Sequence, residues 1–358
     1  MLIYRLNQPL KLESGKTLST VDIAYSISGT PHSDGSNVIV ICHTLTGGIQ
    51  PKSSSIWWFV GPGKLIDTDY FCVIAMAALG SWHGGSSPCW RGNNMEKPLG
   101  IDFPTVSVID SVRAHHQLLT QLGICHARAV IGGSFGGFFS YAWLALYPEM
   151  FDLALIFQSA LLCSAHTMAF FSLAKELICS DPAWNMGKYN KEAISNMVGI
   201  RQLLGLNRLI QLSHARFEEL FPAANRQKEE NIGSHFSLKN SKIDEFMLSA
   251  PKSLQGLDPN SFLCLMQSSK MFDLEKSVPN LWERWKQLKT HLVQIPCAQD
   301  WRYPVSGMLD IHRKAKQTGV NSHLHVTRSR YGHGSFLHDP ESLKSILPLL
   351  YKLLNNPQ

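Results

Sequence analysis

Short apolar runs separated by polar, glycine-containing segments recur along the first half of the chain. The runs that resemble buried strands are residues 38–42, 70–76, 127–131 and 153–157. Largely apolar runs of this length are typical of strands covered on both faces in a parallel sheet. Between two of them, residues 105–122 place apolar side chains at helical spacing, and Gly123 follows as a helix end would require. The alternation predicts an α/β fold with a mostly parallel central sheet.

The pattern changes to helical segments between Ser159 and about His291. These segments are residues 168–179, 194–220 and 259–273. The strand pattern resumes at residues 292–295, and a last strand is expected around Leu324 and Val326. We therefore expect a core of residues 1–159 and 291–358, with residues 160–290 forming a helical lid over the carboxyl edge of the sheet. An independent helical domain is the alternative.

Composition narrows the class of protein. The chain has 358 residues, of which 44% are hydrophobic and 17% charged, as in compact globular proteins. No apolar run reaches transmembrane length, and the first residues lack the pattern of a signal peptide. Eight scattered cysteines without a Cys-x-x-Cys pair indicate buried thiols in a reducing cytoplasm rather than disulfides, and we expect no metal site.

The formal charge of +6 comes without a run of lysines and arginines. The sequence therefore does not predict nucleic-acid binding, and it gives no sign of membrane binding. A modest positive charge favours an anionic small-molecule substrate.

A Gly-x-Ser-x-Gly motif follows the apolar run that ends at Ile131. Gly132, Ser134 and Gly136 form the motif, and a helix-competent segment comes directly after it. A serine on a sharp strand-to-helix turn is the nucleophile elbow of hydrolytic enzymes, where larger residues than glycine would collide with neighbouring elements. The alternative is a glycine-rich turn with an incidental serine.

Two further residues at strand ends complete a nucleophilic site. Asp300 follows the strand at 292–295, and His333 lies in the loop after the last strand. Serine, aspartate and histidine in this chain order are typical of α/β-hydrolases, in which histidine takes the serine proton and aspartate orients the histidine. Asp310 is the nearest rival for the acid. The sequence predicts a catalytic triad of Ser134, Asp300 and His333.

Taken with the loop that begins at His43, these motifs resemble the homoserine O-acetyltransferase family of α/β-hydrolase-fold transferases over nearly the whole chain. The matching stretches are Cys42–Gly47, Gly61–Lys64 with Asp67 and Thr68, Asp102–Pro104, Gly132–Gly137, Asp181–Trp184 with Gly187 and Tyr189, Asp258–Leu263, Asp300 and Trp301 with Pro304, and Gly332 and His333 with Phe336 and Leu337.

The resemblance implies a function and further site residues. It implies transfer of an acetyl group from acetyl-CoA, a co-substrate rather than a bound cofactor, to L-homoserine in methionine biosynthesis. The backbone N–H groups of Leu45 and Phe135 would form the oxyanion hole. An arginine in the lid would hold the acceptor carboxylate, and Arg216 is the candidate. A homodimer through the lid would fit the family.

Three positions depart from the family pattern. Gly334 follows the histidine where the family usually has aspartate, Phe135 follows the serine where methionine is usual, and residues 80–88 differ as a loop. These departures leave the acceptor open, with L-serine or another amino alcohol as alternatives. They also leave open a serine esterase or thioesterase, in which water takes the acyl group. A non-enzymatic protein would require a vestigial triad, yet no triad member is missing.

Overall fold

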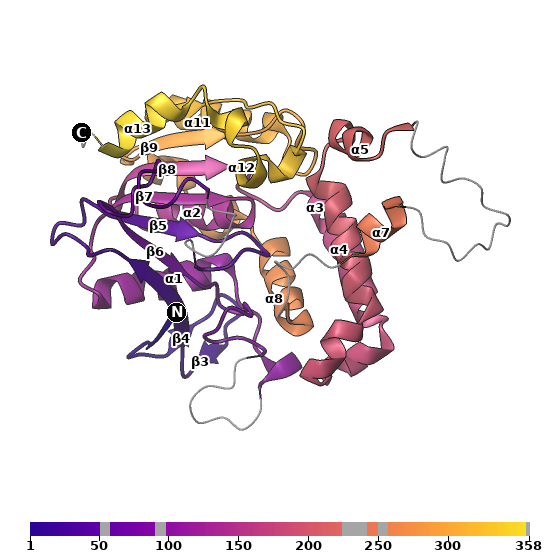
Figure 1. Cartoon of the computed structure of the whole chain (residues 1–358). Coiled ribbons are helices and arrows are strands. Elements are labelled where there is room, and N and C mark those ends of the chain that lie inside the picture. Colours follow the sequence, from indigo (N-terminus) through magenta and orange to yellow (C-terminus); the bar gives the residue numbers. More distant parts are fainter. Residues whose placement is uncertain (51–57, 90–97, 224–241, 250–256, 356–358) are drawn as a thin grey trace.

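One mixed eight-stranded sheet forms the centre of the molecule (Figure 1). This computed structural model describes residues 1–50, 58–89, 98–223, 242–249 and 257–355. The strand order is β1-β4-β6-β5-β7-β8-β9-β10. β1 and β6 pair antiparallel with β4, and every other neighbouring pair is parallel. The predicted α/β fold with a mostly parallel sheet is confirmed.

Strands β5 to β10 lie close to the predicted positions, and β1 and β4 complete the sheet. Their bounds are Leu2–Arg5 (β1), Asp22–Ser28 (β4), Val38–Cys42 (β5), Cys72–Met76 (β6), Ala127–Gly133 (β7), Phe151–Phe157 (β8), His291–Ile295 (β9) and Ser322–Leu324 (β10). A separate hairpin pairs Leu10–Lys11 (β2) with Thr17–Leu18 (β3). The sequence analysis missed this hairpin because strands of two residues carry no periodicity to detect.

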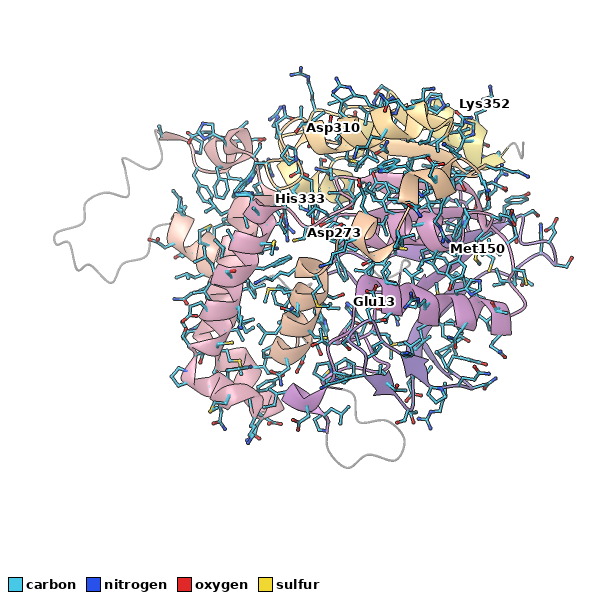
Figure 2. The ribbon with its side chains drawn as sticks, turned by 180° about the vertical axis from the view of Figure 1, so that it is seen from behind. Glu13, Met150, Asp273, Asp310, His333 and Lys352 are labelled. Atoms are coloured by element: carbon cyan, nitrogen blue, oxygen red, sulfur yellow. The ribbon has the colours of Figure 1, made fainter. Side chains whose placement is uncertain are left out.

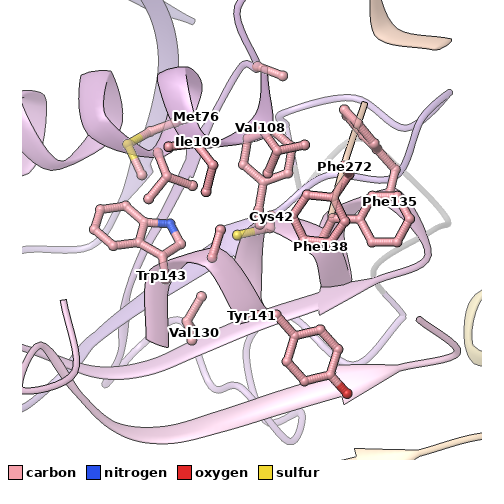
Figure 3. Close-up of a cluster of buried hydrophobic side chains, with 14 of the residues drawn as sticks. Cys42, Met76, Val108, Ile109, Val130, Phe135, Phe138, Tyr141, Trp143 and Phe272 are labelled. Carbon is pink, nitrogen blue, oxygen red and sulfur yellow. The ribbon is translucent and has the colours of Figure 1, made fainter. Parts of the chain in front are cut away.

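Alternate residues of the central strands contribute to two different cores. Val130 belongs to the cluster beneath α1 (Val108–Gln121) and α2 (Phe135–Leu146), whereas Ile131 belongs to the cluster beneath α13 (Leu347–Asn355). Figure 3 shows Val130 with aromatic side chains of the first cluster. Because side chains alternate across a sheet, burial of both sets explains why the strands read as continuous apolar runs.

The described helical segments lie on both faces of this sheet and beside the carboxyl ends of its strands. The remaining α-helices are Ala165–Cys179 (α3), Val198–Gln211 (α4), His214–Leu220 (α5), Lys242–Leu248 (α7), Pro259–Lys270 (α8), Leu274–Ser277 (α9), Leu281–Trp285 (α10), Val305–Gln317 (α11) and Ser335–His338 (α12). Short 3-10 segments span Gly100–Asp102 (η3), Pro182–Gly187 (η4), Lys191–Asn196 (η5), Gly332–Gly334 (η7) and Pro340–Leu343 (η8).

The helical insertion stands beside the carboxyl ends of the strands. In Figure 1, α3, α4 and α7 lie on the side toward which β8 points. The single helix expected over residues 194–220 is two helices, because Leu212 is extended and the Ser213 hydroxyl caps α5 by accepting from the N–H of Arg216. A serine side chain that satisfies a free N–H group stabilises a new helix start.

The last part of the predicted insertion packs on the core. Phe272 stacks on Phe138 of α2 with ring centroids 4.3 Å apart, and Trp285 of α10 stacks on Tyr141 of the same helix. Residues 224–241 and 250–256 of the predicted insertion lie outside the described residues. The division into a core and an insertion of residues 160–290 stays a prediction, with α9 and α10 attached to the core.

The terminal helix does not begin at Asp339 and Pro340, although this pair has the sequence pattern of a helix start. Asp339 caps no helix with its side chain, and its carboxylate instead accepts a hydrogen bond from Ser329 at 2.6 Å. Pro340 begins only the short η8, and α13 starts seven residues later, at Leu347. The side chain of Asp339 therefore accepts from the hydroxyl of Ser329, ten residues earlier, and not from a backbone N–H of a following helical turn.

Two further properties bear on the class of protein. Among the described helices, none is both long enough and apolar enough to cross a bilayer. All eight cysteines are free thiols in the structure.

Candidate active site

Ser134 occupies the turn between β7 and α2 in a strained backbone conformation. Its φ of 56° and ψ of −122° lie outside the regions that residues with side chains normally adopt. A Cβ atom on Gly132 would lie 2.2 Å from the carbonyl oxygen of Gly136, and one on Gly136 would lie 2.2 Å from that of Cys42. Only glycine fits at either position, and this close packing holds the serine at the carboxyl edge of the sheet.

The structure brings Ser134, His333 and Asp300 into one hydrogen-bonded chain. His333 Nε2 lies 2.9 Å from Ser134 Oγ, and His333 Nδ1 lies 2.7 Å from Asp300 Oδ2. All three side chains are buried. An ionised carboxylate can only accept, so we assign the imidazole proton to Nδ1, which leaves Nε2 to accept from the serine hydroxyl. This arrangement can move the hydroxyl proton to the histidine as the serine attacks.

Two backbone N–H groups orient Asp300. Its Oδ1 accepts from Arg302 N at 2.9 Å and from Tyr303 N at 3.0 Å. The rival acid, Asp310, lies on α11, pairs with Arg313 and is 67% exposed along its side chain. Figure 2 shows it well apart from His333. Of the two aspartates, only Asp300 contacts the histidine.

The N–H groups of Leu45 and Phe135 lie at the two elements that meet at Ser134. Phe135 is the first residue of α2, so its N–H has no partner in a preceding helical turn, and Leu45 lines the cavity beside Ser134. Within the described part of the chain, neither N–H donates to another group. Free N–H groups at a helix start favour negative charge. Their role as an oxyanion hole stays a prediction.

A small cavity of about 20 Å³ adjoins the nucleophile. It is lined by Thr44, Leu45, Thr46, Ser134, Asn207, Gln211, Arg302, His333, Phe336 and Leu337. A space of this size has room for about one water molecule. Since Asn207 and Gln211 belong to α4, the helical insertion contributes to the wall of the cavity beside Ser134.

The chain is similar to known enzymes over most of its length. The alpha/beta hydrolase fold family matches residues 37–340. A homoserine O-acetyltransferase from Methanosphaera stadtmanae is 30% identical over 343 residues, which cover 93% of this chain and 69% of that protein. The chain belongs to the homoserine O-acetyltransferase family. This membership in a family of enzymes confirms the resemblance seen in the motifs.

Solved structures with the same fold include proteins named as transferases and proteins named as esterases. The homoserine O-acetyltransferase from Bacillus anthracis superimposes with a TM-score of 0.83 at 22% identity, covering 99% of this chain and 98% of that one. The acetyl esterase MekB superimposes with a TM-score of 0.78 at 25% identity, covering 99% and 97%. Because transferases and esterases share this fold, the site must decide between them.

The arginine expected to hold a carboxylate lies elsewhere. Arg216 pairs with Glu219 at 3.0 Å, and its guanidinium lies 4.9 Å from the ring centre of Tyr331. It is absent from the lining of the cavity, which instead includes another arginine, Arg302. The family resemblance suggested Arg216, and it could not show that this residue lies on a separate helix, α5.

Gln158 is a site residue that the sequence analysis missed. It follows β8 with a φ of 42°, and its Nε2 donates at 2.9 Å to both Asp300 Oδ2 and the carbonyl oxygen of Gly332. Its Oε1 accepts from Ser335 at 3.0 Å. One buried amide thus ties the acid to the histidine loop. The available signal was a polar residue directly after an apolar strand, at the edge where parallel strands end.

Buried histidines support the loop that carries Leu45. His43 accepts from Ala78 N through Nε2 at 3.0 Å, and its Nδ1 donates to the carbonyl of Thr44 at 2.8 Å. The ring of His83, from the loop that departs from the family, lies 5.5 Å from it. Burial lowers the pKa of His43 and His115 to about 4 and that of His83 to about 3. These imidazoles are therefore neutral near pH 7.

In the part of the chain that the structure describes, no group of three or more His, Cys, Asp or Glu side chains is placed to bind a metal ion. The residues that line the cavity instead include Ser134 and His333, whose hydroxyl oxygen and imidazole Nε2 lie 2.9 Å apart. This set of groups suits acyl transfer.

Proposed function

We propose that this enzyme transfers a short acyl group from acyl-CoA, through an ester on Ser134, to the hydroxyl of an amino alcohol. L-homoserine is the first candidate acceptor, because the relatives described above carry the name homoserine O-acetyltransferase. The observation that carries the proposal is the chain of hydrogen bonds from Ser134 through His333 to Asp300, beneath a helical insertion.

In the first half-reaction, Ser134 Oγ attacks the thioester carbonyl while His333 Nε2 takes the hydroxyl proton. The negative charge that develops on the carbonyl oxygen is stabilised by the N–H groups of Leu45 and Phe135. The carbon–sulfur bond then breaks, His333 returns its proton to the departing CoA sulfur, and the acyl group remains on Ser134. Asp300 stabilises the charged imidazole throughout.

In the second half-reaction, His333 takes the proton of the acceptor hydroxyl, whose oxygen attacks the acyl-serine ester. The bond to Ser134 Oγ breaks, and the serine regains its proton from His333. A cavity covered by α4 side chains supports transfer over hydrolysis, because limited space near the ester restricts the access of water.

Hydrolysis is the second candidate function, and Gly334 is the observation that favours it. The family usually has an aspartate directly after the histidine, where it is suited to receive the ammonium group of an amino-acid acceptor. Without that carboxylate, the ammonium group of an amino acid lacks one binding partner. Water then competes better for the acyl-serine ester. The fold shared with an acetyl esterase is consistent with this alternative.

Acyl-enzyme formation provides the first test. After the protein is mixed with acetyl-CoA, intact mass should show one added acetyl group, and Ser134→Ala should show none. Ser140→Ala is the matched control, because it removes the hydroxyl of another buried serine, within α2. This variant should keep the adduct. An adduct that persists in Ser134→Ala would show that another residue is the nucleophile.

The acceptor dependence of CoA release separates the two functions. A transferase should release CoA much faster when L-homoserine is added, and the acetylated amino alcohol should accumulate. An esterase should release CoA and acetate at the same rate with or without added L-homoserine.

We also propose that two copies associate through the insertion. Apolar side chains are exposed on its two longest described helices, Met168 and Leu173 on α3 and Val198 and Leu209 on α4. Exposed apolar side chains that gather on one part of a surface favour association. Light scattering should give the mass of a dimer, and Leu173→Glu combined with Leu209→Glu should give a monomer.

A further inference from the structure

Arg302 carries a buried positive charge that has no anionic partner. Its residue is 5% exposed, and its Nε is a buried donor without a hydrogen-bond acceptor. Among the residues that the structure describes, no carboxylate lies within ion-pair distance of this guanidinium. Buried charges in proteins are normally paired, because removing an ion from water is costly.

Aromatic rings surround the guanidinium. Its central carbon lies 4.9 Å from the ring centre of Phe170, 5.2 Å from that of Phe171 and 5.9 Å from that of Tyr303. The faces of aromatic rings attract cations, which offsets part of the cost of burial. They offer no acceptor for the N–H groups, so the guanidinium keeps its donors for another group.

The position of Arg302 connects this charge to the reaction. Arg302 lines the cavity that also contains Ser134 and His333. Its backbone N–H donates to Asp300 Oδ1, so the turn that fixes the catalytic acid also fixes this residue. Amides of Asn207 and Gln211 line the same cavity and supply further donors. The residues that line the cavity therefore include an arginine and two amide side chains beside Ser134.

We propose that Arg302 binds a carboxylate of the substrate during acyl transfer. A guanidinium presents two parallel N–H donors that match the two oxygens of a carboxylate. The carboxylate belongs either to the acceptor, as in an amino acid, or to a dicarboxylic acyl group such as succinyl. This inference rests on the proposed acyl transfer through Ser134. It identifies a carboxylate as the substrate group that the enzyme recognises.

The acyl arm of the test compares two activated esters, p-nitrophenyl acetate and mono-p-nitrophenyl succinate. If Arg302 binds an acyl carboxylate, wild type should prefer the succinate ester over the acetate ester by about 10- to 100-fold in kcat/KM, the range of a hydrogen bond to a charged group. Arg302→Leu should remove this preference, mainly through KM.

The acceptor arm compares L-homoserine with L-homoserinol, which keeps the amine and the hydroxyl but lacks the carboxylate. If Arg302 binds the acceptor carboxylate, L-homoserine should deacylate the acetyl-enzyme about 10- to 100-fold more efficiently than L-homoserinol, by the same estimate. Arg302→Leu should bring the two acceptors to equal efficiency. Arg302→Lys should restore part of the preference, because it keeps the charge but loses the paired donors.

Arg216→Leu is the matched comparison, since it removes an arginine that lies outside the cavity. It should leave both preferences at their wild-type values. The proposal is overturned if wild type shows neither preference, if Arg302→Leu leaves the observed preference intact, or if Arg216→Leu alone removes it. Because the activated esters acylate Ser134 without CoA, failure of acetyl-CoA to load the enzyme would overturn the proposed function and leave both ratios measurable.

Discussion

The two walls of the active site differ in how their residues are held. On the core wall, Ser134 and Phe135 lie on a turn whose shape follows from neighbouring glycines and from the strand before it. On the insertion wall, Asn207 and Gln211 come from α4, whose place depends on packing against other parts of the insertion.

We expect the two walls to have different roles, the core wall in the reaction itself and the insertion wall in the choice of substrate. A strained serine with free N–H groups beside it can attack any accessible carbonyl, so the core wall supplies the reaction. Side chains of α4, with Arg302 and the histidine loop, form the rest of the cavity and limit what can approach. We therefore expect substitutions of the triad to abolish both half-reactions, and substitutions facing the acceptor to change one of them.

The largest effect is expected for the acid of the triad. Asp300→Asn should lower kcat roughly ten-thousand-fold, by analogy with the serine protease triad, because the amide no longer holds the required histidine tautomer. Asp310→Asn, at an exposed position on α11, should have little effect. Steady-state rates of both variants with acetyl-CoA and L-homoserine provide the measurement. A severe loss in Asp310→Asn with a mild one in Asp300→Asn would mean that the acid is misassigned.

Acid should destabilise the core through two buried histidines, His43 and His115, and the partly buried His83. His43, His83 and His115 have pKa values of about 4, 3 and 4 in the folded protein, below the value of about 6.5 expected when unfolded. The unfolded chain therefore binds more protons between these values, so stability is full above about pH 6.5 and is lost as the pH falls toward 4. One pKa unit corresponds to about 1.4 kcal/mol, so the combined loss is on the order of several kcal/mol.

Urea unfolding followed between pH 7 and pH 4 measures this dependence. His83→Phe removes one of the three titrating groups and should flatten the curve. A free energy of unfolding that is constant over this range would contradict the buried, neutral state of these side chains.

Most of the core wall could be predicted from sequence because its determinants are local. Apolar runs identified the buried strands, the glycines marked the elbow, and chain order placed Asp300 and His333 at strand ends. The insertion wall could not be predicted in the same way. The family resemblance pointed to Arg216, which lies outside the cavity. Arg302, which belongs to the core segment, had no local pattern to distinguish it from a surface arginine. Its burial arises from Phe170 and Phe171, more than a hundred residues away in the chain.

Gln158 links Asp300 to the loop that carries His333, and its substitution should have an intermediate effect. Gln158→Glu keeps the shape but replaces the donor to Asp300 with a second carboxylate, which opposes the charge of Asp300 and leaves the Gly332 carbonyl without its donor. Loss of a hydrogen bond to a charged group should lower kcat about 10- to 100-fold, with a smaller change in KM.

The pH dependence of kcat distinguishes this positioning role from simple destabilisation. Two neighbouring carboxylates should shift the acidic limb of the profile to higher pH, whereas a merely less stable protein should keep the limb in place. Gln158→Asn, which retains an amide with a shorter reach, should recover part of the rate. An unchanged profile together with a lowered melting temperature would argue against the positioning role.

The last expected change concerns Gly334, which directly follows His333. Gly334 is buried with a φ of −83°, and a Cβ atom there would lie 3.2 Å from Cδ2 of His338 and 3.9 Å from the carbonyl oxygen of Gln211. This backbone conformation suits any residue, so an aspartate requires only a small shift of the His338 ring. Gly334→Asp should therefore fold and place a carboxylate beside the catalytic histidine.

A hydrogen bond to a charged group is worth roughly 1.5 to 3 kcal/mol, so Gly334→Asp should raise kcat/KM for L-homoserine by about one to two powers of ten. The rate at which acetyl-CoA loads Ser134 should not change, because the added carboxylate receives only the acceptor amine. Gly334→Ala supplies the Cβ without the charge and should give no gain. Rapid-quench measurement of both half-reactions in all three proteins isolates the effect. If wild type already acetylates L-homoserine efficiently and Gly334→Asp gains nothing, the acceptor amine is held by another group.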